Sequence, residues 1–334
     1  MTAGLAIRRT AYGSADALRL EQLDFSDLAD DHVLVRVRAA SINAADRYLM
    51  SGQPYLMRPT TGWFAPKSKG LGQDVAGEVV AVGKNVTRLK PGDAVFGSTA
   101  EDFSREVDGA FAQYARVPER LLVAKPPNVT FEEAATVPLA GITALQGLRD
   151  AGQVKAGQHV LVNGASGGVG TFAVQLAKVL GAEVTAVCSA RNVDQARQLG
   201  ADHVIDYARE DVFTSAARFD VVFDNAATRK PAECLRLLKP GGRYVFVGTP
   251  QSGRVLGPFI PVMRVGLASI TAPKGSLNVL TEKPTLADLE VLQKLLGSGQ
   301  LRPVVEQVFP LSETAAAMRR FEQGHLRGKL VVTT

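Results

Sequence analysis

His159-Val-Leu-Val-Asn-Gly-Ala-Ser-Gly-Gly-Val-Gly170 is the stretch of sequence that decides the fold of this chain. Its apolar beginning predicts a short buried strand, and a glycine-rich turn follows that opens a helix. Glycines let the backbone approach a pyrophosphate closely, and the N-terminal amides and dipole of a helix attract its negative charge. A strand, turn and helix in this order predict a dinucleotide-binding site, with a purely structural tight turn as the alternative.

The glycine spacing of this turn departs from the strict G-x-G-x-x-G fingerprint of such sites. Ala165 stands where the first glycine would be, and Gly167 and Gly170 follow. We expect the whole turn to contact the cofactor, through Gly164, Ala165, Ser166, Gly167, Gly168, Val169 and Gly170.

The sequence that follows alternates between helical stretches and short apolar runs. Gly181 supplies a stop for the first helix, whose apolar face has helical spacing and consists of Val169, Phe172, Ala173, Leu176 and Leu180. The apolar runs predict strands at 183–189, 203–207, 219–226 and 243–248. Such alternation is typical of a parallel sheet with crossover helices, a doubly wound α/β domain.

The beginning of the chain has a different character. Short β-rich runs punctuated by glycine predict a barrel-like, irregular domain, with strands at 32–41, 76–83 and 93–97. At the other end of the chain, two helical stretches flank a strand-like run and a final strand follows, at 287–299, 304–310, 313–324 and 329–334. This is not another βα repeat, so we expect the tail to return to the N-terminal domain.

The choice of cofactor depends on the end of the second strand, where an enzyme that uses NAD places an acid on the ribose hydroxyls. This chain has Cys188-Ser-Ala-Arg-Asn192 there, without a carboxylate. Ser189 and Asn192 have hydrogen-bond donors, and the planar fork of Arg191 suits a 2′-phosphate. These residues predict NADPH, with a solvated Arg191 and use of NADH as the alternative.

Length and composition are those of an ordinary globular protein of two domains. The chain has 334 residues, of which 46% are hydrophobic and 21% charged. Its net charge of +5 is spread along the chain, so the basic residues predict a solvated surface and make nucleic acid an unlikely partner. Only two cysteines are present, and no disulfide framework or secretory signal is apparent, which predicts a reducing, cytoplasmic location.

One apolar stretch, Val255–Ile270, raises the question of a membrane span. Pro258, Pro261 and Arg264 interrupt it, and it is shorter than the ~20 residues that cross a bilayer. We expect a buried strand, a pocket wall or a subunit contact instead, and no membrane span.

Along nearly its whole length the chain resembles the zinc-independent quinone oxidoreductase branch of the medium-chain dehydrogenase/reductase superfamily. Besides the glycine turn, the motifs that carry the resemblance are Gly72-Gln-Asp-Val-Ala-Gly-Glu-Val-Val-Ala-Val-Gly83, Lys90-Pro-Gly-Asp-Ala-Val-Phe-Gly97, Gly109-Ala-Phe-Ala-Gln-Tyr114, Ala140-Gly-Ile-Thr-Ala144 and Gly328-Lys-Leu-Val-Val332. The order of these motifs is specific to the superfamily, although each alone is unremarkable.

The resemblance implies a GroES-like β-rich catalytic domain and a Rossmann domain. We expect the catalytic domain at 1–126, the NADP-binding Rossmann domain at 127–272, and a return to the catalytic domain at 273–334. The resemblance also implies a homodimer formed through the Rossmann sheets, and closed two-fold dimers are common in general.

Zinc-dependent relatives hold a catalytic metal with a cysteine, a histidine and a third soft ligand. Their motifs place Asn43, Gln73 and Ala140 at those positions, which are poor ligands for zinc. We therefore expect no metal. Without one, simple alcohol oxidation is disfavoured, whereas quinones and α,β-unsaturated carbonyls need only hydrogen bonds to the oxygen where charge develops.

The resemblance also implies which residues contact the substrate. In Ser41-Ile-Asn-Ala-Ala-Asp-Arg-Tyr48 the family pattern puts an asparagine and a tyrosine beside the nicotinamide, and Asn43 and Tyr48 fill those places. We expect them to orient the acceptor, with Tyr48 or water supplying the proton. A turn-stabilising Asn43 and a packed Tyr48 are the alternative, and Asp46 is expected to hold the same turn. Further contacts with the cofactor are implied for Thr143, Tyr207, Asn225, Ala226, Gly248, Thr249, Arg327 and Lys329.

Three functions remain open from the sequence. The first is an NADPH-dependent reductase of a quinone or an α,β-unsaturated carbonyl such as an enone or 2-alkenal. The second is a zinc-free alcohol or enoyl-type oxidoreductase of a biosynthetic pathway, since one scaffold serves many reactions. The third is an NADPH-sensing or RNA-binding protein with little turnover.

Overall fold

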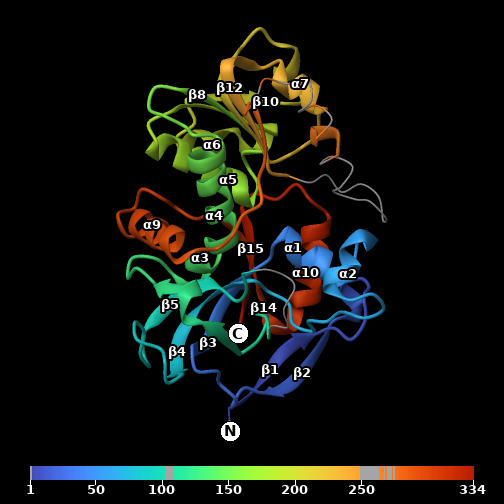
Figure 1. Cartoon of the computed structure of the whole chain (residues 1–334), viewed down its shortest axis with the longest axis vertical. Helices are drawn as coiled ribbons and strands as arrows, with labels where there is room; N and C mark the ends of the chain where they lie inside the picture. Colours follow the sequence, from blue (N-terminus) through green and yellow to red (C-terminus); the bar gives the residue numbers. More distant parts are fainter. Residues whose placement is uncertain (1, 102–107, 249–262, 267, 269–272, 274) are drawn as a thin grey trace. The chain divides into compact units, whose positions relative to one another are not determined.

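The computed structural model describes residues 2–101, 108–248, 263–266, 268, 273 and 275–334 (Figure 1). Over these residues the chain forms two compact units, and we describe each by itself. The first unit comprises Met1–Ile142, Lys283–Gly299 and Pro303–Thr334, and the second comprises Thr143–Glu282 and Gln300–Arg302. Residues 127–142, which the sequence placed with the Rossmann domain, thus lie in the first unit. Residues 275–282 and 300–302, which the sequence placed in the return to the catalytic domain, lie in the second. Thr249 and most of the apolar stretch Val255–Ile270 lie outside the described residues.

The second unit is a doubly wound α/β domain, as predicted. Its described strands form one parallel sheet in the order β10-β9-β8-β11-β12-β13. The strands are β8 (His159–Asn163), β9 (Glu183–Cys188), β10 (His203–Asp206), β11 (Phe219–Asp224), β12 (Leu238–Phe246) and β13 (Leu277–Val279). Its α-helices include α5 (Gly168–Val179), α6 (Val193–Gln198) and α7 (Pro231–Leu235). Because the strand order reverses between β8 and β11, a crevice for a ligand is expected where the carboxyl ends of these two strands meet.

Helix α5 follows β8 through the glycine turn and packs against β8 and β9. Phe172, Ala173 and Leu176 of the predicted apolar face are buried. Thr171, Val174 and Gln175 are buried as well, so the helix is covered on more than the one face that the pattern predicted. Gln175 is satisfied there, because its side chain exchanges two hydrogen bonds with the backbone of Arg302 at 2.8 and 3.0 Å.

The first unit is built on a mostly antiparallel sheet in the order β14-β15-β3-β4-β5-β7, with β6 paired to β3, and on the separate hairpin β1-β2. These strands are β1 (Ala3–Arg8), β2 (Arg19–Asp24), β3 (His32–Ser41), β4 (Asp74–Val82), β5 (Ala94–Ser98), β6 (Tyr114–Pro118), β7 (Leu122–Ala124), β14 (Val305–Pro310) and β15 (Lys329–Thr333). The final strand β15 pairs antiparallel with β3, Val331 opposite Ser41. The final strand therefore lies in the same sheet as the N-terminal strands β3 and β4.

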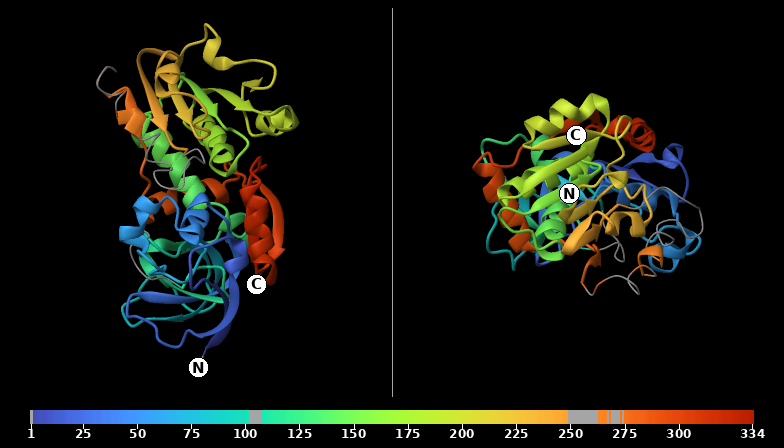
Figure 2. Two further views of the ribbon diagram at one scale, coloured as in Figure 1. Left: turned by 90° about the vertical axis from the view of Figure 1, so that its right-hand side faces the viewer. Right: turned by 90° about the horizontal axis from the view of Figure 1, so that it is seen from above.

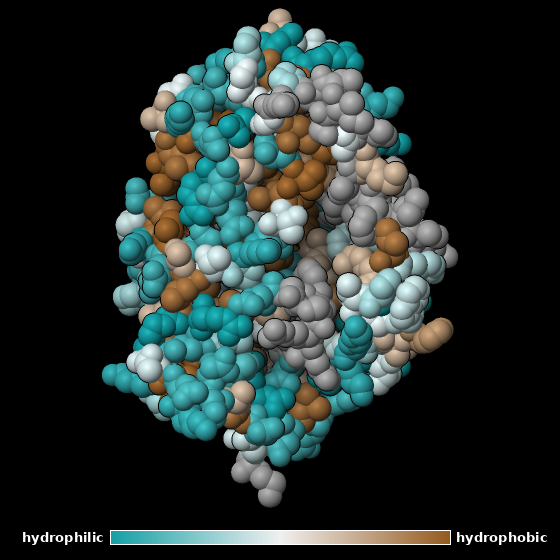
Figure 3. Space-filling model, viewed as in Figure 1, coloured by the Kyte–Doolittle hydropathy of each residue, from teal (hydrophilic) through white to brown (hydrophobic). Residues whose placement is uncertain are grey.

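The α-helices of the first unit connect and cover this sheet. They are α1 (Ala44–Ser51), α2 (Arg58–Thr61), α3 (Phe131–Ala135), α9 (Leu286–Gly297) and α10 (Thr314–Glu322), and the chain passes into the second unit within α4 (Pro138–Gln146). Helix α10 packs against β14 and β15 (Figure 2). The alternating valines of β3, Val33, Val35 and Val37, are fully buried in the core of this unit. Hydrophilic side chains cover most of the face that this unit presents in Figure 3.

Short helical turns complete the described part of the chain. The 3₁₀ turns are η1 (Ala15–Ala17), η2 (Tyr55–Met57), η3 (Glu119–Leu121), η5 (Ala190–Asn192), η6 (Val212–Thr214) and η7 (Leu311–Glu313), and η4 (Gly147–Ala151) is a π-helical turn that continues α4.

Candidate active site

The glycine turn has the geometry expected of a phosphate-binding loop. Gly164 adopts the left-handed region at φ +83°, and the N–H groups of Gly164 and Ala165 donate to the carbonyl of Val187 on β9. Helix α5 begins immediately afterwards with Gly167 as its N-cap. The turn therefore fixes the helix N-terminus at the carboxyl end of β8, where its amides attract an anion.

Gly167 and Gly170 have different roles in the turn. A Cβ on Gly170 would lie 2.1 Å from the Gly164 oxygen, so Gly170 is required for the close approach of helix and strand. A Cβ on Gly167 would meet nothing closer than 3.8 Å. The space beside Gly167 is a cradle that a side chain would fill, and a pyrophosphate fits the backbone amides that border it.

Three further predicted residues lie at the same edge of the sheet. The Asn225 N–H donates to the carbonyl of Asn163 at the end of β8 (3.0 Å), and the Gly248 N–H donates to the carbonyl of Asp224 (3.1 Å). A Cβ on Gly248 would lie 2.0 Å from the Asn225 oxygen. Asn225, Ala226 and Gly248 are thus brought together with the glycine turn at the carboxyl ends of β8, β11 and β12.

The predicted 2′-phosphate loop follows β9 and contains an unusual amide. The Asn192 side chain is 2% exposed and donates from Nδ2 to the Ser189 hydroxyl at 3.1 Å. Among the described residues its Oδ1 has no hydrogen-bond partner. Arg191 is exposed, and the backbone N–H of the half-exposed Tyr207 donates to the carbonyl of Cys188. A buried amide oxygen without a donor costs free energy, so it suits a ligand hydroxyl such as that of a ribose.

The first unit contains a buried polar network around Asn43 and Asp74. The Asp74 carboxylate is fully buried and accepts from the Ser41 hydroxyl (2.7 Å), Asn43 Nδ2 (2.8 Å) and the Leu139 N–H (2.9 Å). The Lys329 ammonium donates to Asn43 Oδ1 and to the Ile42 carbonyl, and lies 3.5 Å from Asp74 Oδ2. The amide of Asn43 is thereby held at both ends.

Asp46 holds the turn in which Asn43 lies. Its carboxylate accepts from the backbone N–H of Asn43 (2.8 Å) and of Gly72 (2.9 Å), and forms the capping box of α1. These contacts support the structural role that the sequence predicted for Asp46. Burial raises the pKa of Asp46 to about 6, and the neighbouring Asp74 acts in the same direction while Lys329 opposes it.

Asp46→Asn is expected to remove a pH dependence of stability. The folded chain binds a proton at Asp46 more tightly than the unfolded chain, because burial raises the pKa from 3.8 to about 6. The stabilising contribution of the protonated Asp46 carboxyl is complete below pH ~4. As the pH rises to about 6, this contribution of about 3 kcal/mol to the free energy of unfolding is lost. The measurement is urea unfolding of both proteins at a series of pH values. A difference between them that stays constant from pH 4 to 7 would contradict the assignment.

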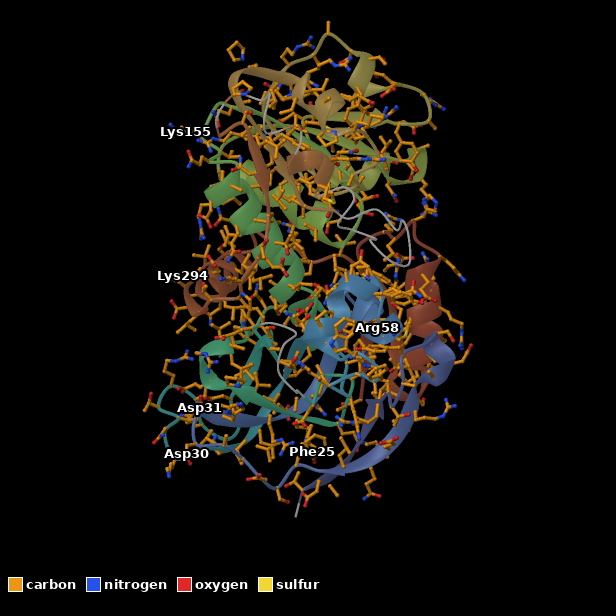
Figure 4. The ribbon with its side chains drawn as sticks, turned by 45° about the vertical axis from the view of Figure 1, so that its right-hand side comes forward. Phe25, Asp30, Asp31, Arg58, Lys155 and Lys294 are labelled. Carbon is orange, nitrogen blue, oxygen red and sulfur yellow. The ribbon has the colours of Figure 1, made fainter. Side chains whose placement is uncertain are left out.

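Tyr48 lies on α1, and interactions at both ends of that helix position it. Tyr48 is half-buried, with the Arg47 guanidinium 5.3 Å from its ring centroid. Gly52 ends α1 in the left-handed region and donates to the Tyr48 carbonyl at 2.9 Å. Arg58, labelled in Figure 4, donates to the Gly52 carbonyl (3.1 Å) and stacks on the Tyr12 ring at 4.7 Å. Tyr48 is therefore presented by a helix capped at both ends.

The remaining predicted residues lie in separate places. Thr143 is buried in α4. Arg327 is exposed, and its backbone N–H donates to Glu306. Sequence reasoning missed two residues, Asp74 and Asp224, although both stand in motifs that it quoted. Their only signal is a charged residue within an otherwise apolar run, which predicts a buried carboxylate with several donors.

A polar cavity of about 780 Å³ also lies in the first unit. Asp31, labelled in Figure 4, and Arg116 are among the residues that line it. Two ion pairs lie in its wall: Arg116 forms a two-point pair with Asp108 at 2.7 and 2.8 Å, and Arg120 bonds Glu101 at 2.7 Å.

A GroES-like unit combined with a Rossmann unit defines a class of two-domain, dinucleotide-dependent oxidoreductases. Two family models match in that order. The one described as "Alcohol dehydrogenase GroES-like domain" matches residues 29–127, and the one described as "Zinc-binding dehydrogenase" matches residues 199–332.

Individual relatives extend over the whole chain. It is 33% identical to the "Quinone-oxidoreductase homolog, chloroplastic" of Spinacia oleracea, over 98% of this chain and 97% of that protein. It is 34% identical to the "NADPH-dependent alkenal/one oxidoreductase, chloroplastic" of Arabidopsis thaliana, over 96% of this chain and 77% of that protein. The solved quinone oxidoreductase of Coxiella burnetii superposes with a TM-score of 0.84 at 30% identity, over 100% of both chains. The chain belongs to the medium-chain dehydrogenase/reductase superfamily, among its quinone oxidoreductase-like members.

The residues that the resemblance places at the zinc-ligand positions, Asn43, Gln73 and Ala140, can be tested for their fit to a zinc ion. Asn43 offers an amide whose oxygen already accepts from the Lys329 ammonium. Gln73 is a buried amide, and Ala140 has no donor atom. Zinc prefers thiolate, imidazole or carboxylate ligands, so this set lacks the chemistry to hold it. Among the described residues, no three His, Cys, Asp or Glu side chains are grouped so as to bind a metal.

Proposed function

We propose that this chain is an NADPH-dependent reductase that delivers hydride to quinones or α,β-unsaturated carbonyl compounds without a catalytic zinc ion. The observation that carries the proposal is the amide of Asn43, held between Lys329 and Asp74 at the position of a zinc ligand. The names of the relatives support a quinone or an enone as the acceptor and a nicotinamide as the reductant. An alcohol or enoyl-type reaction is the second candidate.

A bound nicotinamide supplies the hydride, and the protein must stabilise the charge that then develops on the acceptor oxygen. Asn43 Nδ2 donates one hydrogen to the Asp74 carboxylate. Its other hydrogen makes only a long hydrogen bond to the Ser41 carbonyl oxygen, which lies 3.4 Å from Nδ2. That second hydrogen is the one available to an acceptor oxygen. The Tyr48 hydroxyl supplies the proton that completes reduction, directly or through water.

Tyr48→Phe is expected to lower kcat about 10- to 100-fold while the Kd for NADPH stays within threefold, because only proton transfer is removed. The measurement is steady-state NADPH oxidation with a 2-alkenal, together with a fluorescence titration of NADPH. Tyr55→Phe is the matched control, since Tyr55 lies on the neighbouring turn η2. A Tyr48→Phe protein with the kcat of the wild type would remove Tyr48 from the mechanism.

Arg191→Ala is expected to raise the Kd for NADPH at least about tenfold and to leave that for NADH unchanged. Loss of a charge-assisted bond to the 2′-phosphate accounts for this magnitude. Arg197→Ala is the control, because Arg197 is exposed on the next helix and pairs with Asp194 at 3.5 Å. Equal weakening of both nucleotides would exclude a contact between Arg191 and the 2′-phosphate.

The experiment that tests the function is NADPH consumption by the purified chain with a panel of quinones and 2-alkenals. Turnover with either class is the expected result. A protein that binds NADPH and oxidises it with neither class contradicts the proposal. Turnover restricted to acyl-chain enoyl substrates favours the second candidate, and salt-dependent RNA binding competed by NADPH favours a sensing role.

We also propose a cytoplasmic homodimer that pairs through the Rossmann sheet. Strand β13 is the last described strand on its side of that sheet, and Val279 on it is 42% exposed. An open strand edge is a natural surface for pairing with a second copy. Light scattering during gel filtration measures the mass, and a monomer at micromolar concentration would contradict the dimer. Within the described residues, no helix has the length and apolar character needed to span a bilayer.

A further inference from the structure

Asp224 is a fully buried carboxylate at the carboxyl end of β11, and it is surrounded by donors. Its Oδ1 accepts from Asn163 Nδ2 and from the Ala227 N–H, both at 2.8 Å. Its Oδ2 accepts from the Tyr244 hydroxyl at 2.9 Å and lies 3.8 Å from the Cys234 sulfur. Burial, with the neighbouring carboxylate, raises the pKa of both Tyr244 and Cys234, so these two groups remain protonated donors.

The two oxygens of Asp224 serve different parts of the unit. Oδ2 faces the core, where β12 and α7 supply Tyr244 and Cys234. Oδ1 faces the carboxyl edge of the sheet, where Asn163 is the residue immediately before the glycine turn. One carboxylate oxygen therefore connects the strand that leads into the glycine turn with the turn 225–227.

A strained residue lies at the end of that turn. Ala227 adopts φ +50°, in the left-handed region that non-glycine residues rarely occupy. Such a conformation persists only where the surroundings impose it, and it points to a functional constraint. In this conformation the Ala227 N–H donates to Asp224 Oδ1.

We propose that Asp224 is a positioning residue for the nicotinamide half of the cofactor, because it preforms the turn 225–227 against the glycine turn. The inference rests on the proposed function: a dinucleotide is expected to lie across the switch point between β8 and β11, so that with the 2′-phosphate at the loop after β9 its nicotinamide half falls on the β11 side. A preformed turn binds its ligand without an ordering cost at the moment of binding. The loop 188–192, where the 2′-phosphate is expected, supplies none of the four donors that surround Asp224.

The test compares two nucleotides on the full chain: NADPH, and adenosine 2′,5′-bisphosphate, which lacks the whole nicotinamide half. Asp224→Ala is expected to weaken NADPH binding at least about tenfold and to change the affinity for adenosine 2′,5′-bisphosphate less than threefold. Asp224→Asn is the rescue variant. Its amide oxygen can accept from Asn163 and Ala227 while its NH₂ donates to a rotated Tyr244 hydroxyl, so its NADPH affinity should stay within threefold of the wild type.

Two further variants keep the test decisive. Tyr244→Phe removes a donor from the core side only, so it should lower the melting temperature without weakening NADPH binding. Asn163→Ala removes one hydrogen bond on the turn side and should weaken the binding of NADPH but not that of the shorter nucleotide. This variant provides the test if Asp224→Ala does not fold. Two results would overturn the positioning role but leave the proposed function standing. One is an equal loss of affinity for both nucleotides, and the other is an unchanged NADPH affinity in Asp224→Ala and Asn163→Ala. A wild-type chain that binds neither nucleotide overturns the proposed function and this inference together.

Discussion

A Gly170→Ala protein is expected to lose about 3 kcal/mol of unfolding free energy and at least 100-fold in NADPH affinity. The added methyl group would lie 2.1 Å from the Gly164 oxygen and 2.8 Å from two backbone atoms of Ala165. Backbone atoms cannot turn aside as a flexible side chain does, so α5 must move away from β8, and overpacking of this kind typically costs 1–3 kcal/mol. The shift also misdirects the amides at the start of α5. Urea unfolding without nucleotide and titration with NADPH measure the two effects.

Gly167→Ala is the matched control in the same turn. Its methyl group would meet nothing closer than 3.8 Å, so the unfolding free energy of the nucleotide-free chain should change by less than about 0.5 kcal/mol. NADPH affinity should nevertheless fall, because the methyl group fills the space where a pyrophosphate approaches the backbone. An equal loss of stability in both variants would show that the turn is only structural.

The sequence predicted well those features that depend on residues close together in the chain. The strand, turn and helix at 159–181 follow from local periodicity and glycine placement, and the structure has β8, the turn and α5 within those residues. The predicted runs at 183–189, 203–207 and 219–226 contain β9, β10 and β11. Only parallel pairing with crossover helices buries such strands, so the fold class followed and is confirmed.

The polar contacts of the candidate site could not be predicted in the same way. The amide of Asn43 is held by Lys329, 286 residues later in the chain, and by Asp74, 31 residues away. Local patterns do not determine which partner a polar side chain meets, because the contact with Lys329 depends on the pairing of β15 with β3. The left-handed conformation of Ala227 was equally hidden, since alanine gives no signal for a positive φ.

Lys329→Met is expected to destabilise the chain by about 3–5 kcal/mol, the usual cost of breaking a buried ion pair from one side. The Lys329 side chain is 4% exposed and the Asp74 side chain 0%, so water cannot replace the lost ammonium. Its three contacts, Ile42, Asn43 and Asp74, all belong to the first unit. The Kd for NADPH should therefore change less than threefold, whereas kcat should fall because the Asn43 amide loses its anchor. Urea unfolding measures the stability, NADPH titration measures the Kd, and steady-state kinetics measure kcat.

A double-mutant cycle separates the buried charge from simple loss of packing. Asp74→Asn removes the carboxylate that Lys329→Met leaves unpaired, so the double variant should be more stable than the sum of the single effects by about 2 kcal/mol. Lys294→Met, at an exposed lysine of α9 (Figure 4), should change stability by less than about 0.5 kcal/mol. Strict additivity in the cycle would mean that Lys329 and Asp74 do not interact. A tenfold loss of NADPH affinity in Lys329→Met would instead mean that the ammonium contacts the cofactor, as the resemblance of the C-terminal motif implies.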